Sequence, residues 1–208
     1  MGTLRLEGVG TGLRAAARPL IADFNLRLEA GEAAVLVGPA GRGKSSLLRI
    51  IAGLELAGAG RILIDGRPVQ DLPPSRRGVA MVHARRVLHP HLTVHGNLSL
   101  GPLMRKAGRR EADRRARRAA RGLGLEELLD RLPGVLSPRE RLLAGVGRAV
   151  ALGPRLLLLD EPLAGFAGPA RAGLLAELVA LLGRLGTTLL WATREAQEAK
   201  AIGRRVPL

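Results

Sequence analysis

The chain has 208 residues, of which 47% are hydrophobic, so it is long enough for one α/β domain with a core and is not a disordered chain. No apolar run is long enough to cross a bilayer, the first residues do not form the apolar segment of a signal peptide, and the lack of cysteine excludes disulfides and thiolate metal sites. The net charge of +15 allows a nucleic acid or an anionic membrane as partner. Nearly all of that charge is arginine, which a GC-rich genome would also produce. Aromatic residues make up 1%, which argues against single-strand binding by base stacking.

The first two predicted strands are short segments in which apolar and polar residues alternate. Residues 4–7 and 24–29 have this pattern, which is typical of strands with one buried face. The stretch between them, residues 8–19, has the composition of a loop. Ala30-Gly31-Glu32 then predicts a turn into the next strand.

Residues 38–46 are the stretch with the clearest chemistry. They fit the phosphate-binding pattern G-x-x-x-x-G-K-[ST], after an apolar strand at 33–37 and before a helix that ends near Gly53. Glycines let backbone N–H groups converge on phosphate oxygens, and the helix start adds the positive end of its dipole. Lys44 is expected to meet the β- and γ-phosphates, and the hydroxyl of Ser45 to ligate Mg²⁺. The predicted phosphate-binding residues are Gly38, Pro39, Ala40, Gly41, Arg42, Gly43, Lys44, Ser45 and Ser46.

Two further strands are predicted at 61–66 and 78–82, and the prolines at 73 and 74 interrupt the pattern between them. The next region, 85–93, is predicted to be irregular and lies among four histidines, which raises the hypothesis of a metal site. Their spacing does not place a ligand set on one helix face, and no cysteine or carboxylate cluster joins them. We therefore favour histidines without a metal. They are His83, His89, His91 and His95.

Residues 109–122 predict a helix with one thin apolar side, and a short helix is predicted at 126–131. Most other positions of the first helix are arginine. A solvated helix face is the ordinary interpretation of such a run, and contact with nucleic acid is the alternative. The arginines are Arg110, Arg114, Arg115, Arg117, Arg118 and Arg121.

Four leucines at 156–159 predict a strand buried on both faces, as in a parallel sheet, and two acids follow it. Ligands of open α/β sheets bind at this end of the strands. Asp160 is expected to hold the Mg²⁺ shell through water, and Glu161 to orient or activate an attacking water. Alone, the two acids would be an ordinary polar strand end. Helices predicted at 173–186 and 195–202 and a strand at 187–192 complete an alternation that indicates a mostly parallel sheet.

These motifs resemble, over nearly the whole chain, those of the ATP-binding subunits of ABC transporters, bacterial importers in particular. Residues 38–54 are similar to the Walker A loop and helix, 156–162 to Walker B, and 89–94 with Asn97 to the segment after the Q-loop. The resemblance implies an α/β P-loop NTPase fold with a RecA-like, mostly parallel sheet, an antiparallel β part and an inserted helical subdomain. The implied core is 1–83 and 155–208, and the implied subdomain is 84–154.

The same resemblance implies ATP and Mg²⁺ as cofactors. It implies two partners: an integral-membrane permease and a second ATP-binding subunit, identical or different. The implied location is cytoplasmic, at the inner face of the plasma membrane. The transported substrate and the direction of transport do not follow from the residues.

Several family motifs are replaced in this chain. The signature Leu-Ser-Gly-Gly-Gln falls on residues 136–140, where Pro138 has no N–H to give a phosphate, Arg139 adds bulk and Glu140 adds negative charge. The Q-loop glutamine, the D-loop aspartate, the switch histidine and the adenine-stacking aromatic fall on Ala84, Ala167, Arg194 and Leu13.

The replaced signature still predicts a helix start, with Ser137 as N-cap, Pro138 at N1 and Glu140 at N3. Losing one aimed donor typically lowers a rate by ~10²–10³, so we predict a homodimer that binds Mg·ATP and hydrolyses it poorly. Arg194 acting as a cation near the γ-phosphate is an alternative to a lost switch. For the whole chain the alternatives are a non-catalytic pseudo-ATPase partner or scaffold, a nucleic-acid-associated P-loop ATPase, and a truncated gene product with little room for terminal strands.

Overall fold

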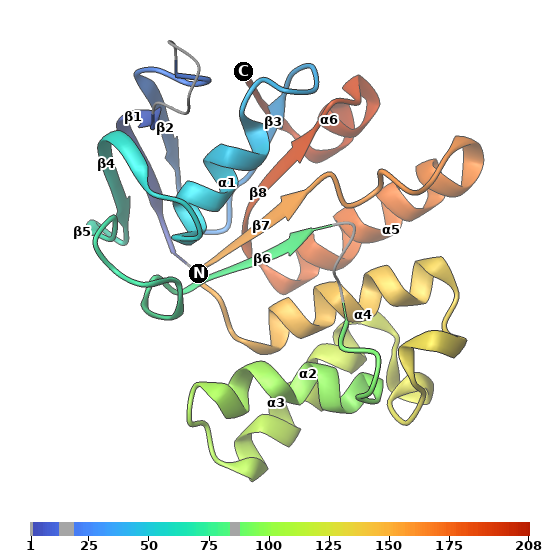
Figure 1. Ribbon diagram of the computed structural model, residues 1–208. Helices are drawn as coiled ribbons and strands as arrows, with labels where there is room; N and C mark the ends of the chain where they lie inside the picture. Colours follow the sequence, from blue (N-terminus) through green and yellow to red (C-terminus); the bar gives the residue numbers. More distant parts are fainter. Residues whose placement is uncertain (1, 13–18, 84–87) are drawn as a thin grey trace. The chain divides into compact units, whose positions relative to one another are not determined.

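The computed structural model of the chain describes residues 2–12, 19–83 and 88–208 (Figure 1). They form two compact units. Unit 1 comprises Met1–Met81, Arg155–Glu161 and Gly186–Leu208, and unit 2 comprises Val82–Pro154 and Pro162–Leu185. The two sheets belong mainly to unit 1, whereas unit 2 is mostly helical.

The first sheet is antiparallel, and its strands pair through leucines and isoleucines. Leu4 pairs with Leu28 on one side and with Ile64 on the other, and all three are buried. Alternation of these buried residues with exposed polar ones gives the sheet one core face. The strand order is β2-β1-β4-β5, with β1 at Leu4–Thr11, β2 at Phe24–Leu28, β4 at Ala57–Ile64 and β5 at Arg67–Pro68.

The second sheet has continuous apolar strands at its centre. Its order is β6-β7-β8-β3-β9, with β6 at Val79–His83, β7 at Leu156–Asp160, β8 at Thr188–Thr193, β3 at Ala33–Val37 and β9 at Arg204–Pro207. Every residue of β7 and β8 is buried, and β7·β8, β8·β3 and β3·β9 are parallel. Such two-sided burial is why these strands are apolar throughout. Trp191 on β8 lies between Leu159 and Val35 of the neighbouring strands, and its Nε1–H donates to Glu198 Oε2 at 2.9 Å.

Two helices belong to unit 1. α1, Lys44–Ala52, buries its apolar side in the core that both sheets share, and α6, Ala196–Ile202, contacts β3, β8 and β9. A chain that leaves β3, turns and enters α1 presents the helix N-terminus at the carboxyl end of the parallel strands. This edge of the sheet therefore holds the ends of β3, β7 and β8 together.

The core of unit 2 is built by three helices that pack on one another, α2 at Val94–Met104, α3 at Arg109–Leu123 and α4 at Pro138–Ala151. Small residues let them approach closely: a Cβ on Gly147 of α4 would lie 3.2 Å from Leu123. α5, Gly168–Leu185, contacts α3. Short 3₁₀ turns lie at Pro74–Arg76 in unit 1 and at Glu126–Leu128 and Pro133–Val135 in unit 2.

The predicted fold class is confirmed, because the structure has a parallel sheet, a separate antiparallel sheet and helices in an α/β arrangement. Some elements differ from their predictions. α2 was not predicted, α5 begins at residue 168 rather than 173, and the predicted helix at 126–131 is a 3₁₀ turn. The chain also ends in β9, which extends the parallel sheet where little room for a strand was expected. None of the described helices is both long enough and apolar enough to span a membrane.

Candidate functional site

The loop between β3 and α1 ends on a glycine whose conformation and surroundings exclude a side chain. Gly43 is the N-cap of α1 with a φ of 88°, and a Cβ there would lie 2.8 Å from Ile21. Within the described residues no side chain caps this helix start, and its first turn contains no acid. In the described part of the chain this helix start therefore lacks a side-chain cap, and its N–H groups together with the helix dipole suit an external anion.

Lys44 lies at the base of this loop with its ammonium turned inward. Its side chain is buried, and Nζ donates to the carbonyl oxygens of Gly38 at 2.6 Å and Pro39 at 2.8 Å. An ammonium has three N–H donors, so one more direction is open to an acceptor. The two carbonyls thus hold the cation inside the loop, where an anion bound by the backbone N–H groups would meet it.

Ser45 and Asp160 join the loop to the end of β7. The Ser45 hydroxyl donates to Asp160 Oδ1 at 2.9 Å, and Asp160 is 2% exposed. A hydroxyl and a carboxylate are hard oxygen donors of the kind that Mg²⁺ prefers, and that ion usually takes one or two protein ligands plus substrate phosphates. The pair therefore fits such an ion. No group of three or more His, Cys, Asp or Glu side chains in the described part of the chain is arranged to hold a metal.

Glu161 follows Asp160 with an unusual backbone. Its φ is 45°, in the left-handed region that non-glycine residues rarely adopt, and its N–H donates to Ala192 O at 2.9 Å. Its carboxylate forms an ion pair with Arg194, with 3.5 Å between Oε2 and Nε. The end of β8 therefore holds both the main chain and the side chain of Glu161.

Arg77 supports the other end of α1 and was not singled out from the sequence. It is 4% exposed and donates to the carbonyls of Ile50 and Ile51, in the last turn of α1, and to those of Leu72 and Gln70. Burial lowers the pKa of its guanidinium, which a nearby aspartate partly offsets. No local pattern predicts this role, because the carbonyls of Ile50 and Ile51 lie more than 20 residues before Arg77 in the chain.

The predicted helix start at residues 137–140 is confirmed. Ser137 is the N-cap of α4 and accepts from the Glu140 N–H, while the Ser137 N–H donates to Glu140 Oε2 at 2.7 Å. This backbone hydrogen bond lowers the pKa of the Glu140 carboxyl. Two N–H groups at this helix start are therefore already bound, and Pro138 contributes none.

Arg139 is tied to α5 of the same unit. Its guanidinium forms two hydrogen bonds with the carboxylate of Glu177, one of them 2.8 Å between Nε and Oε2. The bond to Glu177 raises the pKa of Arg139. This cation therefore already has a partner within its own unit.

Asn97 clamps the loop that carries two of the histidines. It is fully buried; its Oδ1 accepts from His89 N–H at 2.6 Å, and its Nδ2 donates to the carbonyls of His89, Leu92 and Thr93. His95 bonds instead with Asp113 at 2.8 Å, and the positive charge of Arg148 lowers the pKa of His89. The structure therefore gives Asn97 a loop-holding role.

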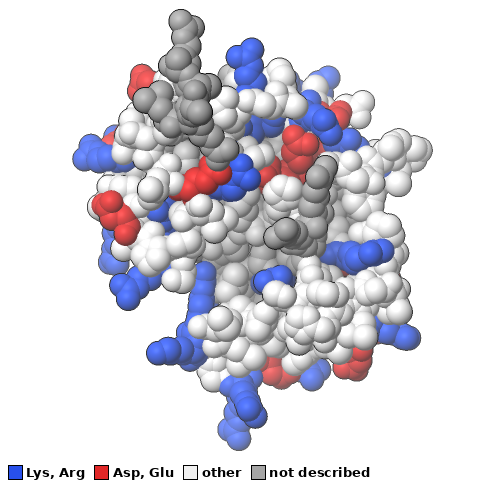
Figure 2. Space-filling model, in the orientation of Figure 1, with Lys and Arg blue, Asp and Glu red and all other residues white. Residues whose placement is uncertain are grey.

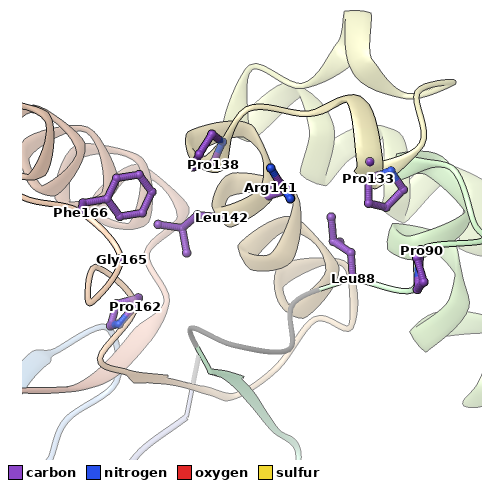
Figure 3. A pocket seen from close by; sticks show the side chains of 10 residues that line it. Leu88, Pro90, Pro133, Pro138, Arg141, Leu142, Pro162, Gly165 and Phe166 are labelled. Atoms are coloured by element: carbon purple, nitrogen blue, oxygen red, sulfur yellow. The ribbon is translucent and has the colours of Figure 1, made fainter.

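Two of the replaced motif positions, Leu13 and Ala84, lie outside the described residues. Ala167, at the D-loop position, is exposed just before α5. A pocket of about 550 Å³ lies in unit 2, with mostly apolar walls that include Pro90 and the start of α4 (Figure 3). Of the described residues that line it, Arg141 alone is charged, so it lacks the acid and metal ligands found around Ser45.

Comparison with known families gives one clear match. The family described as "ABC transporter" matches residues 21–164, which include the loop, Asp160 and Glu161. The alpha-glucoside transport ATP-binding protein AglK of Rhizobium meliloti is 41% identical over 188 residues, covering 90% of this chain and 52% of that protein. The sn-glycerol-3-phosphate import ATP-binding protein UgpC of Bartonella quintana is 42% identical over 187 residues, covering 90% and 54%. The chain thus spans about half the length of these curated relatives.

Solved structures give the same fold. The ADP conformation of MJ1267, described as an ATP-binding cassette of an ABC transporter, superposes with a TM-score of 0.85 at 22% identity, covering 100% of this chain and 87% of that one. The dimeric post-hydrolysis state of the ATP-binding cassette MJ0796, bound to ADP and Pi, has a TM-score of 0.79 at 25% identity, covering 99% and 94%. The first likeness, at its low identity, shows the fold alone.

Proposed function

We propose that this chain, which belongs to the ABC transporter family, is an ATP-binding subunit. It binds Mg·ATP, couples ATP binding and hydrolysis to an integral-membrane permease, and hydrolyses ATP poorly. The two relatives named above are, by their names, ATP-binding proteins of transport or import systems. Such a subunit would work with a second ATP-binding subunit, since one neighbour is a dimeric cassette. It would lie in the cytoplasm against the inner face of the plasma membrane.

One observation carries this proposal: the hydrogen bond between the Ser45 hydroxyl and Asp160 Oδ1. It joins the loop at 38–46 to the carboxyl end of β7 and brings a hydroxyl oxygen and a carboxylate oxygen together, next to the buried Lys44 in the chain. In the proposed roles, the loop N–H groups and Lys44 bind the phosphates, and Ser45 and Asp160 hold the metal ion. Glu161 accepts a hydrogen bond from the attacking water. Bound Mg²⁺ would neutralise charge on the phosphate oxygens.

The domain proposal is a RecA-like core at 1–83 and 155–208 with a helical subdomain at 84–154. Two observations support it: the loop, the proposed metal ligands and Glu161 all lie in unit 1, and α2, α3 and α4 pack together in unit 2. The segment 162–185 packs with unit 2, and the proposal assigns it to the core by resemblance alone.

Contacts in two places, at Glu161 and at the start of α4, support poor hydrolysis. The Glu161 carboxylate is paired with Arg194, so one of its oxygens is occupied by a cation instead of a water molecule. The start of α4 has its Ser137 and Glu140 N–H groups bound by side chains, and Arg139 is bound to Glu177. A helix start with these groups bound offers few donors to a nucleotide on another subunit.

The bound groups at the start of α4 also support a second candidate, a pseudo-ATPase that pairs with a different, intact subunit. Turnover measured alone and after addition of such a subunit separates the two. Activity that appears only in the mixture favours the pseudo-ATPase, whereas slow activity of the chain alone, abolished by Glu161→Gln, favours the homodimer.

The direct test of nucleotide binding is a titration with fluorescent Mg·ATP. The wild type should saturate, and Lys44→Ala should lose most of its affinity because it removes the cation held by the Gly38 and Pro39 carbonyls. Lys106→Ala is a matched control, since it removes an exposed lysine in unit 2. Circular dichroism of each variant confirms folding. Absence of saturable binding by the wild type would refute the proposed function.

A further inference from the structure

The basic residues of this chain are concentrated in one short segment of unit 2. Residues 105–121 contain nine of the 33 basic residues and two acidic ones. This is roughly three times the density of basic residues in the chain as a whole. A general preference for arginine therefore does not account for the segment.

The arginines of α3 form a stripe along its solvent side, which we name the cationic stripe. Its members, Arg110, Arg114, Arg117, Arg118 and Arg121, are all exposed. The buried residues of α3 are Ala112, Ala116, Ala119, Ala120 and Leu123. Each stripe residue stands two positions before a buried one, and two positions correspond to a rotation of about 200° around the helix axis. The stripe is about 16 Å long from Arg110 to Arg121. The stripe therefore faces directly away from the core of unit 2.

Part of this charge is not neutralised within the protein. Glu111 pairs with Arg114 and Arg115, and Asp113 pairs with Arg117. Among the residues that the structure describes, Arg110, Arg118 and Arg121 have no ion pair. In Figure 2, Lys and Arg side chains project from the part of the surface where Figure 1 shows α3.

Two exposed apolar side chains lie next to the stripe in the chain. Leu103 is 43% and Met104 is 77% exposed at the end of α2, directly before Arg105 and Lys106. α2 and α3 pack together, so these residues and the first turn of α3 are neighbours. Apolar side chains flanked by cations suit the boundary between lipid headgroups and acyl chains. A surface for single-stranded nucleic acid would use aromatic rings for stacking, and residues 94–123 contain no Phe, Tyr or Trp.

We propose that the cationic stripe, with Leu103 and Met104 beside it, binds the surface of an anionic lipid bilayer directly. Headgroup phosphates attract the arginines, and the two apolar side chains enter the headgroup region. Each basic residue near such a surface strengthens binding about fivefold, so three arginines contribute about a hundredfold. This contact needs neither a permease nor nucleotide, and it therefore stands or falls independently of the proposed function.

The test is co-sedimentation of the full chain with vesicles of phosphatidylcholine alone or mixed with phosphatidylglycerol. The wild type should bind the mixed vesicles and not the neutral ones, and binding should fall as salt is raised from about 0.05 M to about 0.5 M. The stripe variant Arg110→Gln/Arg118→Gln/Arg121→Gln should bind about a hundredfold more weakly. Its matched control is Arg67→Gln/Arg76→Gln/Arg184→Gln, which removes three exposed arginines elsewhere and should retain most of the binding.

A second pair of measurements separates lipid from nucleic acid. Leu103→Ser/Met104→Ser should weaken vesicle binding and leave binding to duplex DNA unchanged. The proposal is overturned if the wild type ignores the anionic vesicles, or if the control variant loses as much binding as the stripe variant. It is also overturned if duplex DNA at equal phosphate concentration binds more tightly than the vesicles, which would favour a nucleic-acid surface. Circular dichroism serves as the folding control for the variants.

Discussion

Replacing Arg77 by methionine should destabilise unit 1 strongly, because this buried side chain binds the last turn of the helix that begins at Lys44. Methionine keeps much of the volume of arginine and removes all of its donors. The change leaves the carbonyls of Leu72 and Gln70, now bound at 2.7–2.8 Å, and that of Ile51, bound at 3.3 Å, without their partner. The effect should begin at the last turn of α1 and spread to the core behind it.

The magnitude follows from the number of groups left unpaired. Each buried polar group without a partner costs about 1–3 kcal/mol, and some of these carbonyls will find water, so we expect about 3–5 kcal/mol in total. A protein of this size loses roughly 2–4 °C in Tm per kcal/mol, which predicts a fall of about 6–20 °C. The Tm of Arg77→Lys should lie between those of the wild type and Arg77→Met, because an ammonium cannot reach four carbonyls spread around a planar guanidinium.

Thermal unfolding followed by circular dichroism measures this directly. Arg76→Met is the matched control, since the neighbouring arginine is exposed and the same substitution there should shift Tm little. Equal shifts in the two variants, or a shift below about 2 °C for Arg77→Met, would show that the hydrogen bonds to α1 contribute little to stability.

Three further outcomes are expected. Arg194→His should raise the ATP turnover about tenfold, because it frees the Glu161 carboxylate from its ion pair. This is a fraction of the ~10²–10⁴ that a general base supplies, and steady-state kinetics should show the change in kcat. Ser137→Ala should cost about 1 kcal/mol by removing a helix cap, whereas Ser75→Ala in an exposed turn should not, as urea unfolding will show. Because the folded pKa of Glu140 lies below its ordinary value of 4.5, its stabilisation is present above that value and is lost as the pH falls through the folded pKa. Glu140→Gln keeps the cap without titrating, so below about pH 4.5 its Tm should fall less steeply than that of the wild type.

The central strands β3 and β7 and the phosphate loop could be predicted because their signals are local. Residues 33–37 and 156–159 are apolar without interruption, and a strand buried on both faces needs no other information. The cap of α4 was equally readable, since Ser137, Pro138 and Glu140 are neighbours in the chain.

The elements that the sequence did not reveal depend on distant partners. α2 contains Gly96, Gly101 and Pro102, which are poor helix formers, and it is held by the Thr93 cap and by burial of residues such as Leu98. The ion pair of Glu161 with Arg194 likewise joins the ends of two different strands, so the sequence around either residue does not predict it. The sequence suggested a phosphate-side role for Arg194, and the structure adds its carboxylate partner.

The position of Trp191 makes the protein its own optical probe. The chain contains one tryptophan and no tyrosine, so excitation near 295 nm reports from a single ring. That ring is completely enclosed at the centre of β8, between the strand that leads into the phosphate loop and the strand that ends in Asp160. Emission maximum and quenching by iodide would therefore follow the integrity of this sheet without any label, in every variant named above.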